Sequence, residues 1–294
     1  MKELVIISGK GGTGKTSLIA GFASLAKNKV LCDADVDAAD LHLITAPKIL
    51  ETHEFEAGHM PIIHQDKCTQ CGLCRELCRW DAISTDFIVD TIECEGCGVC
   101  YYFCPEDAIS FPANICGEWF ISDTRFGPMA HAILGYAEEN SGRLVTLVRN
   151  LATDLASGQA GNPETPDSLS GRIIIDGSPG TGCPVIASVS GANFAVVVTE
   201  PTVSGLHDLV RVFDLTRHFR VATGVIVNKA DLNEEMTERI RTATLEAGAR
   251  FLGTVPYDAA FTRAQIRRQT LLEQGDGPAA QAVREIWEEI ADSR

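Results

Sequence analysis

The sequence predicts an α/β fold: a doubly wound, mostly parallel sheet with a small inserted α+β domain. Three observations support this prediction. Short apolar runs alternate with helical segments along most of the chain, one region is rich in cysteine, and 45% of the 294 residues are apolar. A chain of this length and composition can bury one large core and one small core. We place the insert at residues 56–115 and the main domain at residues 1–55 and 116–294.

The composition limits the classes of partner. The formal net charge is −15, whereas nucleic acids and anionic membranes are bound mainly through patches of Lys and Arg. We therefore expect no nucleic acid and no membrane as a partner. No apolar run reaches the roughly 18–20 residues that span a bilayer, and the start of the chain does not resemble a signal peptide, so we expect a cytoplasmic protein. Eleven cysteines in such a chain indicate metal thiolates rather than disulfides.

The chain opens with a strand, a glycine-rich loop and a helix. The apolar run from Glu3 to Ser8 is typical of a buried parallel strand, and Thr16 to Ala26 has helical periodicity. A second strand is predicted at Lys29 to Asp33. This βαβ opening predicts a doubly wound sheet, in which ligands bind outside the carboxyl ends of the strands.

The rest of the main domain continues the alternation. After the insert, Trp119 to Ser122 predicts a strand and Pro128 to Glu138 a helix, while Leu144 to Val148 is either a short strand or the start of a helix. The segment from Ser157 to Ser170 is rich in Gly, Pro, Ser and Asn and predicts a surface loop. Four further strands are predicted, at Arg172–Asp176, Phe194–Thr199, Ala222–Asn228 and Arg250–Val255.

The glycine-rich loop fits the phosphate-binding pattern G-x-x-x-x-G-K-[ST] and lies between a strand and a helix, as the P-loop requires. Backbone N–H groups of such a loop curl around phosphate oxygens, and the helix N-terminus adds its positive end. We expect Lys15 to reach the β and γ phosphates and the Thr16 hydroxyl to bind Mg²⁺. The predicted nucleotide-binding residues here are Gly9, Lys10, Gly11, Gly12, Thr13, Gly14, Lys15, Thr16 and Ser17.

Lys10 is the less common element of this loop. With it, the chain resembles the MinD/Mrp/ParA superfamily of P-loop ATPases. Together with the cysteine-rich insert, it resembles the members with an inserted 2[4Fe-4S] ferredoxin domain, which are often labelled cobyrinic acid a,c-diamide synthase-like. The resemblance covers residues 1 to about 50 and 117 to 294. It implies a nucleotide-sandwich dimer in which Lys10 contacts the nucleotide of the facing subunit.

The same resemblance implies roles for acidic residues at two strand ends. Asp33 would hold the Mg²⁺ shell and Asp35 would orient the attacking water, with Asp37 as the alternative for that water. Asp176, in a stretch that resembles the Walker B strand, would contact Mg²⁺ through its outer shell. The alternative role for Asp176 is a helix cap. The predicted catalytic residues are Lys10, Lys15, Asp35 and Asp176.

The sequence leaves open whether the bound base is adenine or guanine. Asn228-Lys229-Ala230-Asp231 has the spelling of the guanine-binding N-K-x-D motif. The superfamily also places an Asn here against adenine, and Pro256-Tyr257-Asp258 resembles the adenine-side loop of Mrp-like members. We favour ATP over GTP and predict base-side contacts from Asn228, Pro256 and Asp258.

Two cysteine runs in the insert share the spacing C-x2-C-x2-C-x3-C, which is the pattern of bacterial ferredoxins with two [4Fe-4S] clusters. They start about 26 residues apart, and each is followed by Asp-Ala-Ile. In this pattern the fourth cysteine of each run ligates the other cluster. One cluster should use Cys68, Cys71, Cys74 and Cys104, and the other Cys94, Cys97, Cys100 and Cys78. Zinc is the alternative, but zinc sites prefer two separated ligand pairs.

Three cysteines lie outside these runs. Cys32, inside a strand, and Cys116, just after the insert, are expected as buried thiols. Cys183 follows Asp176 and has two interpretations. By resemblance to the nitrogenase iron protein, two copies of Cys183 at a dimer axis would bind a metal centre, whereas a thiol packed beside a helix start is the favoured alternative.

A nucleotide switch and a redox module in one chain predict that slow, partner-stimulated ATP hydrolysis is coupled to electron transfer through two [4Fe-4S] clusters. The expected assembly is a homodimer or a heterodimer with a paralogous ATPase, together with a redox or metallocluster partner protein. Two alternatives are an Mrp-like carrier or assembly protein for metalloclusters and a spatial organiser of the MinD or ParA type. Against the last, Glu285, Glu288 and Glu289 make the C-terminal segment acidic, whereas lipid-docking helices are basic.

Overall fold

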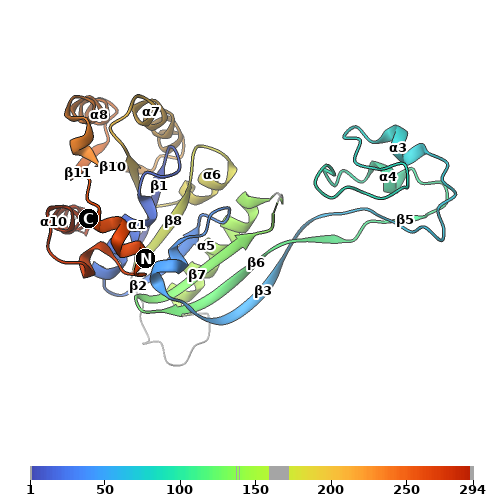
Figure 1. Cartoon of the computed structure of the whole chain (residues 1–294), viewed down its shortest axis with the longest axis horizontal. Helices are drawn as coiled ribbons and strands as arrows, with labels where there is room; N and C mark the ends of the chain where they lie inside the picture. Colours follow the sequence, from blue (N-terminus) through green and yellow to red (C-terminus); the bar gives the residue numbers. More distant parts are fainter. Residues whose placement is uncertain (1, 137, 139, 159–171, 292–294) are drawn as a thin grey trace. The chain divides into compact units, whose positions relative to one another are not determined.

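The structure, a computed structural model of the chain, describes residues 2–136, 138, 140–158 and 172–291 (Figure 1). The chain forms two compact units. Unit 1 comprises Met1–Thr52, Trp119–Ile133 and Ser141–Arg294, and unit 2 comprises His53–Glu118 and Leu134–Asn140. The segment that the sequence marks as the insert therefore falls inside unit 2, which also takes in residues on both sides of it.

The large sheet has nine strands within the described residues, in the order β11-β10-β9-β1-β8-β2-β7-β6-β3. The strands are β1 (Lys2–Ser8), β2 (Lys29–Ala34), β3 (Lys48–His59), β6 (Ala113–Thr124), β7 (Gly127–Leu134), β8 (Arg172–Pro179), β9 (Phe194–Thr199), β10 (Ala222–Asn228) and β11 (Arg250–Val255). Parallel pairing links β11, β10, β9, β1, β8, β2 and β7 in turn. The mostly parallel sheet that the sequence predicts is confirmed.

Helices connect these strands. The elements of unit 1 are α1 (Lys15–Leu25), α2 (Leu41–Thr45), α5 (Ser141–Ser157), α6 (Cys183–Val189), α7 (Val203–His218), η1 (Ala230–Leu232), α8 (Glu234–Glu246), α9 (Ala260–Ile266), η2 (Leu271–Glu273) and α10 (Pro278–Ala291). The segment Leu144–Val148, left open from the sequence, is part of α5. The loop predicted from Ser157 to Ser170 lies outside the described residues beyond residue 158.

The sheet is covered on both faces. Leu4 and Ile6 of β1 belong to a buried cluster with residues of α1 and α10, and the rings of Phe22 and Trp287 stack between these two helices at 5.6 Å. Successive side chains of a strand point to opposite faces, so the buried Val5 and Ile7 lie on the other face. There α5 packs against β2 and β8. Burial on both faces explains why the central strands read as continuous apolar runs.

The helix predicted at Pro128–Glu138 is wrong, because residues 127–134 form β7. Only Arg125 and Phe126 separate β7 from β6, and a two-residue connection is long enough only for an antiparallel hairpin. Pairing of β7 with β2 aligns Met129 with Leu31. The helix-forming residues of this segment are thus overridden by pairing partners that lie far away in the sequence.

The strand predicted at Trp119–Ser122 is real but longer, since β6 runs from Ala113 to Thr124. No strand is predicted from the sequence at β3. Its side chains are exposed except for Phe55 and Ala57, so it lacks the apolar run by which buried strands are recognised. A strand at the edge of a sheet is expected to have this polar character.

Unit 2 contains two copies of one small motif. The helices α3 (Leu73–Leu77) and α4 (Val99–Tyr102) pack together, and the strands β4 (Ile62–Ile63) and β5 (Ile109–Ser110) pair antiparallel. The Asp-Ala-Ile echoes adopt matching backbones, with φ of 52° at Asp81 and 48° at Asp107. The Ala and Ile that follow each Asp are buried. The internal repeat read from the sequence is therefore also a structural repeat.

Among the described residues, no helix is both long enough and apolar enough to pass through a bilayer.

A buried histidine gives the fold a defined response to pH. His131 of β7 is 5% exposed and shares a 2.9 Å hydrogen bond between its Nε2 and the Ser122 hydroxyl of β6. Its ring stacks on Phe120 at 4.9 Å. Burial, and to a lesser extent His42, lowers the pKa of His131 from 6.5 to about 4.

We predict that His131 makes the protein less stable in acid. Between pH 6.5 and about pH 4 the unfolded chain binds a proton at this position and the folded chain does not, so the free energy of unfolding falls as the pH falls through this window. Urea unfolding of wild type and His131→Gln at several pH values should give a shallower slope for the variant. The exposed His218→Gln is the control, and equal slopes for all three proteins would contradict the assignment.

Candidate nucleotide site and cysteine cavities

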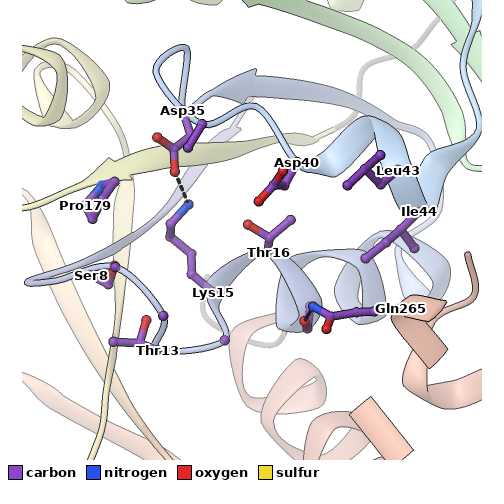
Figure 2. A pocket seen from close by; sticks show the side chains of 15 residues that line it. Ser8, Thr13, Lys15, Thr16, Asp35, Asp40, Leu43, Ile44, Pro179 and Gln265 are labelled. Atoms are coloured by element: carbon purple, nitrogen blue, oxygen red, sulfur yellow. Dashed lines mark hydrogen bonds and ion pairs between the residues drawn. The ribbon is translucent and has the colours of Figure 1, made fainter. Parts of the chain in front are cut away.

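The loop between β1 and α1 encloses one side of a cavity of about 480 Å³ (Figure 2). The loop turns through Gly12 and Gly14, whose φ angles are 79° and 83°. A Cβ on Gly14 would lie 2.4 Å from Asn228 Nδ2, so this position has both a backbone and a spatial reason to be glycine. The lining residues from this segment are Ser8, Gly11, Gly12, Thr13, Gly14, Lys15, Thr16 and Ser17.

Lys15 extends from the start of α1 into this cavity, where Figure 2 shows it directed at Asp35. The Nζ atom lies 3.1 Å from Asp35 Oδ2 and also pairs with Asp176 Oδ1. Burial lowers the pKa of Lys15, but the carboxylates of Asp176 and Asp35 outweigh it and raise that pKa above 10.5. The ammonium is therefore charged and is held by two acids from the ends of β2 and β8.

Three buried oxygen atoms around Lys15 have no hydrogen-bond partner among the described residues. They are Thr13 Oγ1, Asp35 Oδ1 and Asp176 Oδ2. Buried polar atoms are normally paired, so these atoms point to a polar ligand that belongs here. A hydroxyl and carboxylates beside a phosphate loop are oxygen donors of the kind that Mg²⁺ prefers. Thr16 and Asp35 both line the cavity and fit a magnesium site.

Asp33 lies behind this site rather than in it. Its side chain is fully buried, Oδ1 accepts from the Asp35 N–H at 3.3 Å, and Oδ2 accepts from the Leu41 N–H at 3.2 Å. Burial and the neighbouring Asp176 raise the pKa of Asp33 well above 3.8. Asp33 thus fixes the backbone of the segment that carries Asp35. Asp37 is exposed and does not line the cavity.

The residues that match the N-K-x-D pattern, Asn228 to Asp231, brace the phosphate loop. Asn228 Nδ2 donates to the Thr13 carbonyl at 2.8 Å, and Lys229 Nζ donates to the Gly12 carbonyl at 3.4 Å. Asp231 Oδ1 accepts from the Tyr257 N–H at 2.6 Å. These contacts tie the loop to the end of β10 and engage the Asp that a guanine base would need.

Lys10 turns away from the cavity. Its Nζ lies 3.3 Å from Glu200 Oε2, 3.4 Å from Ser204 Oγ and 3.5 Å from Thr202 Oγ1. Glu200 also pairs with Lys229. The two lysines of the loop therefore have separate surroundings, with Lys15 inside its own site and Lys10 outside it.

The far wall of the cavity comes from segments that the sequence does not mark. Gln265 of α9 lines it and donates from Nε2 to Ser17 Oγ at 2.8 Å. The predicted base-side residues Pro256 and Asp258 do not line it, and Asp258 Oδ1 instead accepts from the Ala260 N–H at the start of α9. The other lining residues missed from the sequence are Ala38, Asp40, Leu43, Ile44 and Pro179.

Unit 2 contains two small cavities, each lined by four cysteines. One is lined by Cys68, Cys71, Cys74 and Cys104, and the other by Cys78, Cys94, Cys97 and Cys100. Each cavity thus takes three cysteines from one run and the fourth from the other run. This is the division that the ferredoxin spacing predicts.

Each cavity offers four thiols, the donor type that binds iron–sulfur clusters. Within the described residues, no group of three or more His, Cys, Asp or Glu side chains is close enough to hold one metal ion. The remaining lining is mostly apolar, with Ile63, Phe87 and Ile109 around one cavity. Burial raises the pKa of the Cys100 thiol to about 11.

A family profile described as the CobQ/CobB/MinD/ParA nucleotide binding domain matches residues 4–271. The chain belongs to this family. Members of the MinD/ParA group are nucleotide-binding ATPases, and the cavity around Lys15 lies where a doubly wound sheet binds its ligand, at the carboxyl ends of β1, β2 and β8.

Two relatives come from Methanocaldococcus jannaschii. The uncharacterized protein MJ0578 is 30% identical over 296 residues, which cover 99% of this chain and 96% of the relative. The uncharacterized protein MJ0579 is 23% identical over 303 residues, which cover 99% and 98%. One organism therefore holds at least two full-length relatives of this CobQ/CobB/MinD/ParA family member.

Two of the solved structures of similar fold are MinD proteins. The septum site-determining protein MinD of Pyrococcus horikoshii, complexed with Mg-ADP, has a TM-score of 0.59 at 17% identity, with 99% of this chain and 96% of that chain covered. The cell division ATPase MinD of Pyrococcus furiosus has a TM-score of 0.57 at 16% identity, with 100% and 99% covered. At these identities the likeness establishes the fold alone.

The remaining cysteines of this family member differ in exposure. Cys32 and Cys116 are fully buried, as the sequence predicts, and Cys116 Sγ donates to the Ala57 carbonyl at 2.9 Å. Cys183 is the first residue of α6 and is exposed. The favoured prediction of a packed thiol is therefore wrong at Cys183, because its helix begins at the protein surface.

We predict that Asn228→Ala weakens MgATP binding. Loss of the 2.8 Å bond to the Thr13 carbonyl leaves the phosphate loop without one buried contact, which costs about 1–2 kcal/mol and hence about 5- to 30-fold in affinity. Titration calorimetry measures this change. Asn233→Ala is the matched control because Asn233 bonds a backbone N–H at the start of α8. Equal affinity of Asn228→Ala and wild type would contradict the bracing role.

Proposed function

We propose that this protein is a dimeric, MgATP-dependent ATPase whose nucleotide state controls electron transfer through two [4Fe-4S] clusters. The observation that carries the proposal is the presence, in one chain, of a phosphate-loop cavity and of two cavities that each collect four cysteines. Clusters of this type, when bound, supply single-electron redox chemistry. The chain supplies the thiols, the apolar surroundings and the nucleotide site.

In the proposed ATPase, Lys15 exchanges partners when a triphosphate binds. Its ammonium now pairs with Asp35 and Asp176, and it would turn to the β and γ phosphates, which backbone N–H groups of the loop also bind. Both carboxylates then lose their counter-ion. Mg²⁺, held by the Thr16 hydroxyl with the acids nearby, would supply the positive charge that replaces it.

Asp35 is our proposed residue for orienting the attacking water. It lines the cavity, and its Oδ1 has no partner among the described residues. Burial raises the pKa of Asp35 to about 6, which brings this carboxyl close to the range that suits a general base. Asp33, which binds the Asp35 and Leu41 N–H groups, would position this segment without touching the water. Asp176 would act from the end of β8.

We propose ATP as the nucleotide. Asp231, which would read guanine in an N-K-x-D motif, already accepts a hydrogen bond from the Tyr257 N–H. Asn228 and Lys229 bond the loop carbonyls and so have a structural task instead. These contacts support a bracing role for the motif, and on that ground we favour ATP over GTP.

We propose that two copies, or this chain and a paralogue, form the active dimer. Lys10 lies outside its own nucleotide cavity and pairs with Glu200, so it is available to the phosphates of a facing subunit once that pair breaks. The two M. jannaschii relatives, at 30% and 23% identity, make a paralogous partner a reasonable alternative to a second copy. Each dimer would need a redox partner that accepts or supplies the electrons.

A metallocluster carrier is the second candidate function. The exposed Cys183, at the start of α6, favours it because two such thiols at a dimer axis would hold a labile metal centre. A spatial organiser is the third candidate function, and it is supported by the CobQ/CobB/MinD/ParA profile and by the likeness of fold to MinD proteins at under 20% identity. We therefore keep electron transfer as the leading proposal.

We predict that MgATP changes the rate at which the reduced clusters give up electrons. Anaerobic protein, reduced with dithionite and mixed with a one-electron acceptor, should reoxidise at different rates with and without MgATP. Lys15→Ala and Lys10→Ala should abolish the difference, because one loses the phosphate contact and the other the contact across the dimer. The exposed Lys27→Ala is the control. A rate independent of ATP, with ready cluster donation to an apo-acceptor, would favour the carrier.

We predict that the two cysteine cavities load as exchanged sets. Wild type purified without oxygen should contain about eight irons per chain, as two [4Fe-4S] clusters require. Cys74→Ser with Cys104→Ser removes two ligands from one cavity and should leave about four irons and one cluster signal in electron paramagnetic resonance. Cys74→Ser with Cys78→Ser removes one ligand from each cavity and should damage both clusters. The opposite pattern would show that the runs do not exchange ligands.

A further inference from the structure

Two strands of the large sheet, β3 and β6, each run through a boundary between unit 1 and unit 2. β3 begins at Lys48, shortly after α2, and α2 supplies Leu43 and Ile44 to the cavity wall. β6 ends at Thr124. β3 passes from unit 1 into unit 2 at Thr52–His53, and β6 returns from unit 2 to unit 1 at Glu118–Trp119. A contact that joins these strand ends to the cavity wall would therefore join the two proposed chemistries.

Arg125, in the two-residue turn after β6, makes such a contact. Its Nε donates to the Ile44 carbonyl of α2 at 3.1 Å. Its Nη1 and Nη2 donate to the two carboxylate oxygens of Glu273 at 2.7 and 3.0 Å, and Nη2 also donates to the Arg268 carbonyl at 3.2 Å. One guanidinium thus links the β6–β7 turn, α2 and the segment that follows α9.

Two of the three linked segments belong to or adjoin the wall of the nucleotide cavity. Ile44 lines the cavity directly, and Gln265, three residues before Arg268, lines it from α9. Glu273 is itself fixed, because its Oε2 accepts from the Thr270 N–H at 2.7 Å. The guanidinium also lies 4.5 Å from the ring centroid of Phe126. A planar fork with five N–H donors satisfies these partners together, and the single ammonium of Lys cannot.

We propose that Arg125 is a positioning residue that transmits the state of the nucleotide cavity to the β6–β7 turn and so to β6. This inference rests on the proposed function, because it names the residue through which ATP would act on the cluster-bearing unit. When a nucleotide orders Ile44 and Gln265, the Arg125 bonds hold the β6–β7 turn to the ordered wall. Without the guanidinium, nucleotide binding would still order the cavity wall but would no longer order the β6–β7 turn.

Backbone hydrogen exchange tests this role without relying on catalysis. Full-length, anaerobically purified protein is compared with and without the magnesium complex of a non-hydrolysable ATP analogue. In wild type we expect nucleotide to slow exchange in residues 11–17, 41–45 and 113–124. In Arg125→Ala the slowing should persist in the first two segments and disappear in the third, a loss of about tenfold, or about 1.4 kcal/mol of protection.

Two further variants keep the test decisive. Arg125→Lys should behave like Arg125→Ala, since charge alone does not restore the fork, and it covers the case in which the alanine variant folds poorly. Arg217→Ala, which removes an exposed arginine paired with Asp214 on α7, should behave like wild type. Persistent slowing in residues 113–124 of both Arg125 variants, or its absence in wild type that binds the analogue, would overturn the role of Arg125. Absence of any nucleotide effect in wild type would instead overturn the proposed function.

Discussion

A buried ammonium held between two buried carboxylates is the interaction on which unit 1 depends. Lys15, Asp35 and Asp176 are each less than a tenth exposed, and buried charges are tolerated only when they are paired. Their pairing requires the ends of β1, β2 and β8 to meet, and the sheet order β1-β8-β2 brings them together. The parallel register then sets Asp33 opposite Asp176. The same arrangement that allows these charges inside the protein also leaves them ready for a phosphate and a divalent cation.

The sequence predicts the parts of the site that local chemistry determines. The phosphate loop needs glycine at positions 12 and 14 because their φ angles are positive. Glycine at such positions can be recognised directly from the sequence. The spacing of the two cysteine runs likewise predicts which thiols lie together, because cysteines three residues apart can line the same cavity. Strands buried on both faces, such as Phe194–Thr199, are found at their full length for the same reason.

Other parts depend on neighbours that are distant in the sequence. Residues 127–134 contain good helix formers, yet they form a strand because β2 and β6 lie on either side of them. Gln265 lines the cavity and bonds Ser17 of α1, which lies 248 residues away in the sequence. Arg125 looks like a polar turn residue until Ile44, Arg268 and Glu273 surround it. Asp33 matches a family motif for Mg²⁺, but its local bonds to backbone N–H groups place it behind the site.

The position of β8 in the sheet has a consequence for the order in which the protein is made. β1 and β2 are not adjacent, because β8 lies between them, and residues 172–179 are synthesised long after the two N-terminal strands. Both cysteine runs, by contrast, are complete once residue 104 has left the ribosome. During translation both cysteine runs are therefore complete while the large sheet is still open. A ribosome that stalls before β8 would release a chain in which β1 has neither of its neighbouring strands and β2 has only β7.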